Sequence, residues 1–113
     1  MEAGASRGEL AIRQAGRPDR SMPLLLAEVT IGRNPACTLA LDYPAVSWNH
    51  LRLVWQPEAG YVAIDLNSTH GTVVDGRRID RPVLLRPQSR IWLGDALGNG
   101  VALIYLPAEE MSR

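Results

Sequence analysis

The sequence predicts an all-β fold, an antiparallel sandwich or a barrel of about ten or eleven short strands. Two observations predict this class: hydrophobic residues recur with a period of two over most of the chain, and turn-forming residues separate the apolar runs. No stretch of ten residues keeps a helical period. Because 113 residues can close one hydrophobic core, we expect a single domain over residues 9–107, with 1–8 and 108–113 as flexible ends or linker stubs.

The first half of the chain contains five β-prone runs. Four of them are short and lie at residues 10–13, 23–29, 30–33 and 39–41. The turn signals in this half are Ala15-Gly16 and Asn34-Pro35, which supply the positive or fixed φ that turns need. The fifth run, residues 50–56, is the clearest strand, because Leu51, Leu53 and Trp55 fall on one face. We therefore expect Trp55 in the core.

The second half continues the same pattern. Residues 61–66 alternate and follow the loop 57–60, which has a common hairpin length. Asp75-Gly76, between the run 72–74 and residues 77–79, is the strongest single hairpin signal. Further short runs lie at residues 83–85, 90–93 and 101–106. The run 90–93 carries Trp92, which we also expect in the core.

Composition excludes several classes of partner. Twelve arginines balance twelve acidic residues, so no overall field favours nucleic acid. The longest apolar stretches, 22–27 and 101–106, are far shorter than the roughly 20 residues of a membrane helix, so we expect no membrane insertion. Cys37 has no second cysteine to pair with, which favours a reducing, cytoplasmic location. The oligomeric state stays open.

Three polar loops carry side chains with phosphate-binding chemistry. They are Gly32-Arg33, residues 47–50 with sequence SWNH, and residues 67–72 with sequence NSTHGT. The loops of a β-sandwich gather at its ends, so these three can meet at one apex. Arginine pairs bidentately with phosphate, and hydroxyl and backbone N–H groups complete the oxygen shell. The loops therefore predict a phosphate pocket.

The order of these motifs, GRNPACTLAL, then SWNH, then DLNSTHGTVVDG, resembles the forkhead-associated (FHA) domain family, and we expect a bacterial member. The resemblance is dense over residues 30–79 and covers the flanking strands only by pattern. It implies an antiparallel β-sandwich with binding loops at one apex. It also implies a phosphothreonine-dependent protein–protein interaction module of signalling or recruitment, whose partner is a phosphorylated substrate of a Ser/Thr kinase.

The resemblance also implies a role for each motif residue. Arg33, Ser47 and Thr69 match the positions that bind the phosphate. Gly32 matches the glycine before the arginine, and His50 matches a histidine that braces the binding loops from beneath without contacting ligand. Gly71 and Thr72 match the end of the loop motif.

Two positions depart from the family pattern. His70 stands where asparagine usually holds the backbone of the peptide, and Trp48 stands where arginine is frequent. We expect these two residues, together with Asn49 and Ser68, to face the peptide. The departures leave an alternative open: a phosphate-independent assembly or oligomerisation module on the same fold, with a degenerate pocket.

Catalysis is not expected. Ser47, His50 and Asp65 could be considered as a hydrolase triad, but the sequence has no G-x-S-x-G elbow and the domain is too small to enclose much substrate. Cys37 and the two histidines lack the spacing of zinc motifs, and no phosphate-binding nucleotide loop is present. We therefore expect no enzyme activity, no metal and no cofactor.

Overall fold

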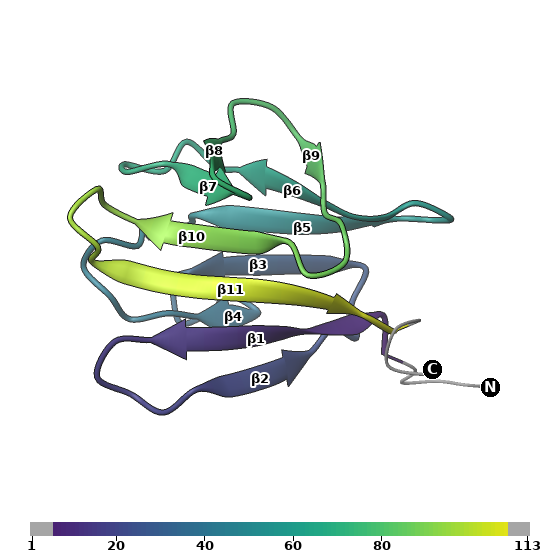
Figure 1. Ribbon diagram of the computed structural model, residues 1–113, viewed down its shortest axis with the longest axis horizontal. Helices are drawn as coiled ribbons and strands as arrows, with labels where there is room; N and C mark the ends of the chain where they lie inside the picture. Colours follow the sequence, from purple (N-terminus) through teal and green to yellow (C-terminus); the bar gives the residue numbers. More distant parts are fainter. Residues whose placement is uncertain (1–5, 109–113) are drawn as a thin grey trace.

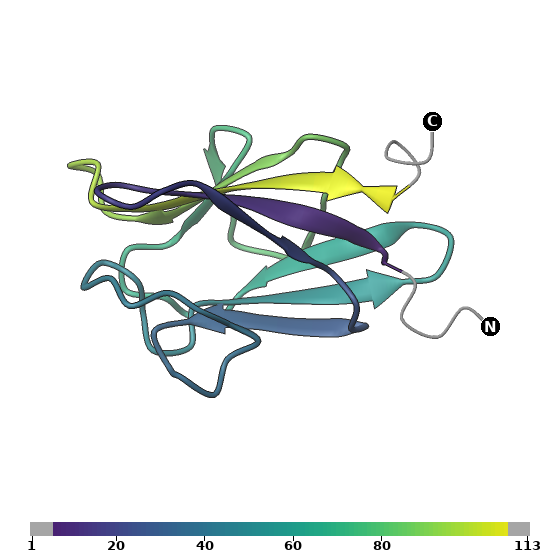
Figure 2. The same ribbon diagram turned by 90° about the horizontal axis from the view of Figure 1, so that it is seen from below.

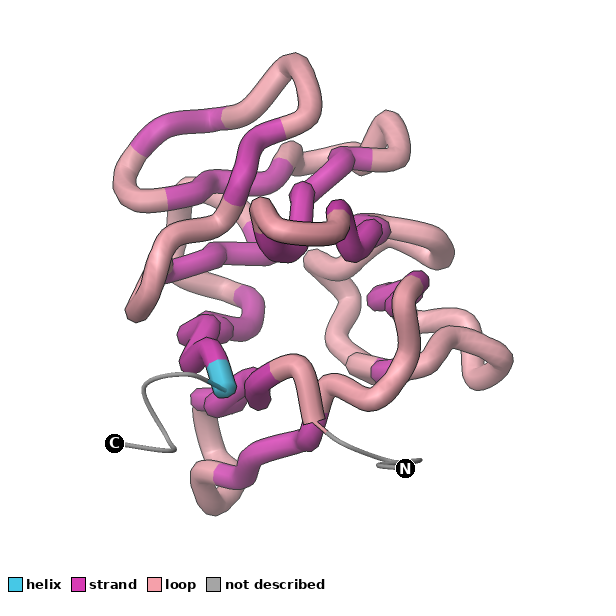
Figure 3. The backbone as a smooth tube through the Cα atoms, turned by 90° about the vertical axis from the view of Figure 1, so that its right-hand side faces the viewer, coloured by secondary structure: helices cyan, strands magenta, loops and turns pink. Residues whose placement is uncertain are grey.

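The computed structural model describes residues 6–108 and consists of two β-sheets packed face to face (Figures 1 and 2). The strands are β1 (Gly8–Gln14), β2 (Arg20–Pro23), β3 (Glu28–Gly32), β4 (Leu39–Ala40), β5 (Leu51–Gln56), β6 (Gly60–Asp65), β7 (Thr72–Val74), β8 (Arg77–Arg78), β9 (Val83–Leu84), β10 (Arg90–Gly94) and β11 (Gly100–Pro107). Loops make up much of the chain between them (Figure 3). The predicted all-β sandwich is confirmed. Residues 1–5 and 109–113 of the predicted flexible ends lie outside the described residues.

The strands divide into a six-stranded and a five-stranded sheet. Their orders are β2-β1-β11-β10-β7-β8 and β4-β3-β5-β6-β9. Neighbouring strands pair antiparallel, except that β4 runs parallel to β3, with Ile31 opposite Leu39. The hairpin predicted at Asp75-Gly76 joins β7 to β8, and both of its turn residues have positive φ, at 51° and 86°.

The core lies between the two sheets and takes alternate residues from each strand. Leu51 and Leu53 of β5 are fully buried, and so are Leu10 and Ile12 of β1 in the opposite sheet. Trp55 continues the inward face of β5 and packs partly buried against the core. The prediction for Trp92 is wrong. In β10 the buried apolar side chains are those of Ile91 and Leu93, so Trp92 lies on the outer face, half-buried, and its indole N–H donates to the Asp95 carbonyl (3.2 Å).

The strand predicted at residues 23–29 is a crossover instead. Strand β2 ends at Pro23 in the six-stranded sheet, and β3 begins at Glu28 in the five-stranded sheet, so the segment between them passes from one layer to the other. Leu24 is fully buried and anchors the crossover, whereas Leu25 and Leu26 are 45% and 53% exposed. A continuous apolar run is compatible with a strand and with an anchored crossover, and periodicity does not separate the two.

The loops that follow β3, β6 and β10 and the loop that precedes β5 all lie at one end of the sandwich, on the left of Figure 1. Both ends of the described chain lie at the opposite end. Different strands therefore carry the three predicted phosphate-binding loops to the same apex.

None of the described residues form a helix that is long and apolar enough to cross a membrane.

Candidate functional site

Arg33 stands at the apex where β3 ends against the 47–48 backbone. Gly32 permits this approach, because a Cβ atom there would lie 2.3 Å from the Trp48 carbonyl oxygen. The Arg33 N–H donates to the Ser47 carbonyl (3.0 Å), and its Nε donates to the Val46 carbonyl (2.6 Å). The second bond fixes the plane of the guanidinium and leaves its two Nη groups for a ligand.

Trp48 flanks this guanidinium. Its side chain is 52% exposed, and the centroid of its ring lies 5.8 Å from Arg33 Cζ, within the range of a cation–π interaction. The Trp48 carbonyl accepts from the Asn34 N–H (3.0 Å), and Asn34 Nδ2 lies 3.4 Å from Asn49 Oδ1. The Trp48 ring therefore packs beside the Arg33 guanidinium, and the neighbouring Asn49 is exposed.

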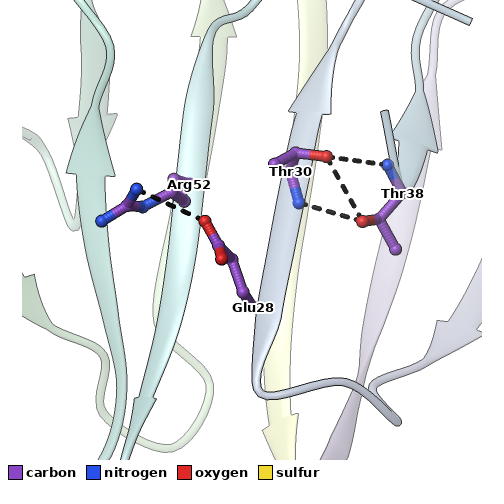
Figure 4. Close-up of polar contacts among 4 residues, drawn as sticks. All are labelled: Glu28, Thr30, Thr38 and Arg52. Atoms are coloured by element: carbon purple, nitrogen blue, oxygen red, sulfur yellow. Dashed lines mark hydrogen bonds and ion pairs between the residues drawn. The ribbon is translucent and has the colours of Figure 1, made fainter. Parts of the chain in front are cut away.

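A second set of contacts holds the loop that follows Arg33. Thr30 of β3 and Thr38 exchange hydrogen bonds: the Thr38 N–H donates to Thr30 Oγ1 (2.9 Å) and the Thr30 N–H to Thr38 Oγ1 (3.1 Å) (Figure 4). On the same sheet, Arg52 of β5 forms an ion pair with Glu28 (3.3 Å). The segment 34–38 is thus tied at its far end to the strand that carries the arginine.

Ser47 and Thr69 meet across the apex. The Thr69 N–H donates to Ser47 Oγ (2.9 Å), although the two residues are 22 positions apart. Since Ser47 is also bonded to Arg33 through its carbonyl, the three residues predicted to bind phosphate lie together. The Thr69 side chain is exposed, so its hydroxyl is open to a ligand.

His50 lies beneath these residues and is fully buried. Its Nδ1 accepts from the Ser47 N–H (3.0 Å), so Nε2 carries the proton and donates to the Gly71 carbonyl (2.9 Å). Burial disfavours the imidazolium and lowers the pKa of His50, although the bond to Gly71 and the charge of Asp65 act in the opposite direction. A neutral imidazole therefore connects the loop before β5 with the loop after β6.

Asp65 organises the loop after β6. Its carboxylate accepts from the Ser68 hydroxyl (2.6 Å), the Ser68 N–H (3.1 Å) and the Thr72 hydroxyl (2.6 Å). Burial alone would raise the pKa of Asp65, but these hydrogen bonds together outweigh it and lower that pKa. From the sequence, Asp65 is considered only as a member of a catalytic triad. An aspartate directly before a Ser/Thr-rich loop is a signal that could have identified it.

Ser68 is consequently placed away from the position expected for a peptide-contacting residue. Only 9% of its surface is exposed, and its hydroxyl proton is used by Asp65. Asn67 at φ 60° and Gly71 at φ 85° turn the loop on either side of it. Ser68 therefore braces the loop from inside.

His70 is exposed at the edge of a neighbouring pocket of about 430 Å³. Tyr43, Asp95 and Asn99 also line this pocket, so it involves the turn between β10 and β11. Hydrogen bonds from the Asn99 side chain and backbone lower the pKa of Asp95, and the charge of His70 adds to this effect. His70 thus lies one residue beyond Thr69, between the phosphate residues and a second hollow of the apex.

A comparison with known families matches the FHA domain over residues 29–94, a span that includes every motif residue described above. The chain belongs to the FHA domain family. A curated relative, the proliferation marker protein Ki-67 of Mus musculus, is 33% identical over 78 residues, which cover 68% of this chain and 2% of that protein. This FHA domain therefore spans a very small part of the length of that relative.

Solved structures give the same fold. EmbR of Mycobacterium tuberculosis, solved in complex with a low-affinity phosphopeptide, superimposes with a TM-score of 0.72 at 26% identity, covering 88% of this FHA domain and 24% of EmbR. The N-terminal FHA domain of S. cerevisiae Rad53p, solved with a phosphothreonine peptide, gives a TM-score of 0.73 at 19% identity, covering 90% and 95% of the two chains.

The apex of this FHA domain brings together a cation and neutral polar groups, which is chemistry suited to an anion. Arg33 supplies a fixed cation, and Ser47 and Thr69 supply neutral groups beside it. Ser47, His50 and Asp65 do not form a nucleophile–base–acid relay, because both imidazole nitrogens bond to backbone groups and Asp65 bonds to Ser68 and Thr72. Among residues 6–108, no three His, Cys, Asp or Glu side chains are grouped as metal ligands would be.

Proposed function

We propose that this FHA domain is a phosphothreonine-dependent interaction module that recruits a phosphorylated protein, the substrate of a Ser/Thr kinase, and that it catalyses no reaction. The observation that carries this proposal is the fixed guanidinium of Arg33, held by Val46 beside Ser47 and Thr69. A phosphoryl group brings about −1.5 to −2 charges and three acceptor oxygens. The oriented guanidinium of Arg33 and the hydroxyls of Ser47 and Thr69 supply the positive charge and the donors that such a group needs.

The phosphopeptide complexes of EmbR and Rad53p support the same class of ligand. By position, Arg33, Ser47 and Thr69 hold the phosphate, and Gly32, His50, Gly71 and Thr72 maintain the loops. His70, Trp48 and Asn49 are exposed at the same apex and face the peptide. Ser68 leaves this peptide-facing set, because its hydroxyl is used by Asp65. The free thiol of Cys37 suits action in a reducing compartment such as the cytoplasm.

The test uses degenerate peptide pools with a fixed central residue. Phosphothreonine, phosphoserine and unmodified threonine pools are titrated against the protein by fluorescence anisotropy. We expect saturable binding of the phosphothreonine pool and weaker binding of the other two. Comparable affinity for all three pools would contradict the proposal.

Variants locate the effect at the apex. Arg33→Ala removes a charge-assisted contact and is expected to cost about 2–5 kcal/mol of binding free energy, roughly thirtyfold or more in affinity. Arg20→Ala is the matched control, because Arg20 is an exposed arginine on β2 in the other sheet. Circular dichroism of both variants checks that the fold is retained.

The alternative is a phosphate-independent assembly module. The exposed face of Trp48 favours it, since an exposed aromatic side chain suits a protein interface. It predicts a natural partner or a second copy of the chain bound equally well by the Arg33→Ala variant. Retained partner binding by that variant would replace the first proposal with this one.

A further inference from the structure

Arg78 lies against the loop that carries Thr69. It belongs to β8, which pairs with β7 so that Arg78 stands opposite Val73, and the following Ile79 N–H donates to the Thr72 carbonyl (2.9 Å). A Cβ atom at Gly71 would lie 2.4 Å from Arg78 Nε and 2.8 Å from Cζ. The guanidinium therefore packs on the backbone of Gly71, two residues from Thr69.

A hollow of about 360 Å³ opens beside this guanidinium. Arg78 and Arg81 line it together with Asn67, an exposed residue of the loop that carries Thr69. The hollow thus extends from the loop after β6, which carries Thr69, to the segment after β8. A ligand chain that leaves the apex in this direction meets polar groups and two cations.

Two carboxylates also line the hollow, and both are already engaged. Asp65 accepts three hydrogen bonds from Ser68 and Thr72, and Asp80 forms an exposed ion pair with Arg81 at 3.6 Å. Arg78 is exposed and takes part in no ion pair within residues 6–108. Of the two arginines that line this hollow, Arg78 is therefore the one without a carboxylate partner among the described residues.

We propose that Arg78 forms a second anion site for an acidic group on the same phosphothreonine-containing chain, either a carboxylate or a second phosphoryl group. This inference rests on the proposed function and narrows its substrate class to acidic segments. Gly71 is two residues from Thr69, so their Cα atoms are at most about 7 Å apart. An extended peptide advances about 3.3 Å per residue, which places the second anion about two to four residues from the phosphothreonine.

The experiment compares phosphothreonine peptide pools that differ in one flanking residue. One pool has neutral flanks, a second series has aspartate fixed at one position up to four residues away on either side, and a third series has phosphoserine at the same positions. The measured quantity is the ratio of the acidic-pool affinity to the neutral-pool affinity. Aspartate and phosphoserine distinguish a carboxylate from a phosphoryl ligand.

Arg78→Gln is compared with Arg77→Gln, which is the matched control. Arg77 is the neighbouring exposed arginine on β8, and its side chain lines a different hollow, with Val74 and Asp75. We expect at least one acidic position to raise wild-type affinity about two- to fivefold, a gain typical of an exposed charge contact, and to lose that gain at high salt. Arg78→Gln should reduce the ratio to about one, whereas Arg77→Gln should retain it.

The outcomes separate this inference from the proposed function. Phosphothreonine-dependent binding with no gain at any acidic position overturns the second site alone. So does a gain that persists in Arg78→Gln. If the neutral phosphothreonine pool binds no better than its unphosphorylated counterpart, the proposed function fails, and the second site fails with it.

Discussion

His50 connects two loops of the apex through its two ring nitrogens. Nδ1 accepts from the Ser47 N–H and Nε2–H donates to the Gly71 carbonyl, and an imidazolium could not accept the first of these bonds. Protonation of His50 therefore breaks its hydrogen bond with the N–H of Ser47, a residue that we assign to phosphate binding.

We predict that the stability of the protein decreases as the pH falls below about 6.5. Burial lowers the pKa of His50 in the folded protein below 6.5, so the unfolded chain takes up this proton at a higher pH than the folded protein. The contribution of neutral His50 to the free energy of unfolding is complete above pH 6.5. It is lost between pH 6.5 and the lowered pKa of His50, and over that range the free energy of unfolding changes by at most about 1.4 kcal/mol per pH unit. Urea denaturation at pH 5.0–7.5 measures it.

Two variants test whether His50 causes this pH dependence of stability. His50→Gln should lose the slope and about 1–3 kcal/mol of stability at pH 7.5, because the Ser47 N–H and the Gly71 carbonyl lose their partner. His70→Asn removes the exposed histidine and should retain the slope. A slope that survives in His50→Gln would refute the assignment.

A second residue-scale prediction concerns Asp65. Asp65→Asn replaces a carboxylate that accepts three hydrogen bonds and should lower the free energy of unfolding by about 1–3 kcal/mol. Asp19→Asn is the control, because Asp19 is exposed and its ion pair with Arg13 is 3.7 Å long, so its effect should stay within about 0.5 kcal/mol. Equal effects in urea denaturation would show that the Asp65 network does not stabilise the loop.

At the residue scale, sequence patterns located the motif positions but not the contacts that support them. Arg33, Ser47 and Thr69 stand in recognisable motifs, and their binding roles remain predictions. The Val46 carbonyl that orients Arg33 is a backbone atom, which no side-chain pattern reports. The packing of Arg78 on Gly71 depends on the register of β8 and could not be derived from spacing alone.

At the scale of elements, two glycines with nearly the same φ have different surroundings. Gly71 has φ 85° and Gly76 has φ 86°, a region that costs an L-residue about 1–2 kcal/mol. A Cβ atom at Gly76 would meet nothing within 4 Å, whereas one at Gly71 would meet Arg78. The two positions therefore share backbone strain and differ in crowding.

We predict that Gly76→Ala costs about 1–2 kcal/mol of stability and leaves phosphopeptide affinity unchanged. Gly71→Ala should cost more, because it also displaces Arg78, and should weaken binding through the loop that carries Thr69. Thermal denaturation and peptide titration of both variants measure these effects. Identical results for the two variants would contradict the packing of Arg78 on Gly71.

Most strands could be predicted because each has a half-buried face and a defined turn. The hairpin at Asp75-Gly76 is an example, since its two residues favour the positive φ that the turn adopts. The crossover 24–27 could not be predicted, because its apolar residues resemble a strand and only the assignment of β2 and β3 to different sheets reveals its course. Residues 20–22 of the edge strand β2 lie outside the predicted runs, because Arg20 and Ser21 are polar and exposed.

At the scale of the whole molecule, the sandwich brings motifs that are far apart in sequence to one end. Arg33 follows β3 and Ser47 precedes β5 within the five-stranded sheet, whereas Thr69 lies in the connection from β6 of that sheet to β7 of the six-stranded sheet. The loop between β10 and β11 reaches the same end from the other sheet (Figure 1). The fold class therefore predicts that the loops gather, and hydrogen bonds fix how they meet.

The central claim is that a phosphothreonine side chain binds at this apex. The most direct measurement is ¹⁵N–¹H NMR of the labelled protein, titrated with the tightest-binding phosphothreonine peptide and with its unphosphorylated form. We predict that the largest shift changes occur at the amides of Arg33, Ser47 and Thr69 and depend on the phosphate. Changes centred on residues 24–27 and 57–60 at the opposite end, or equal changes with the unphosphorylated peptide, would contradict the claim.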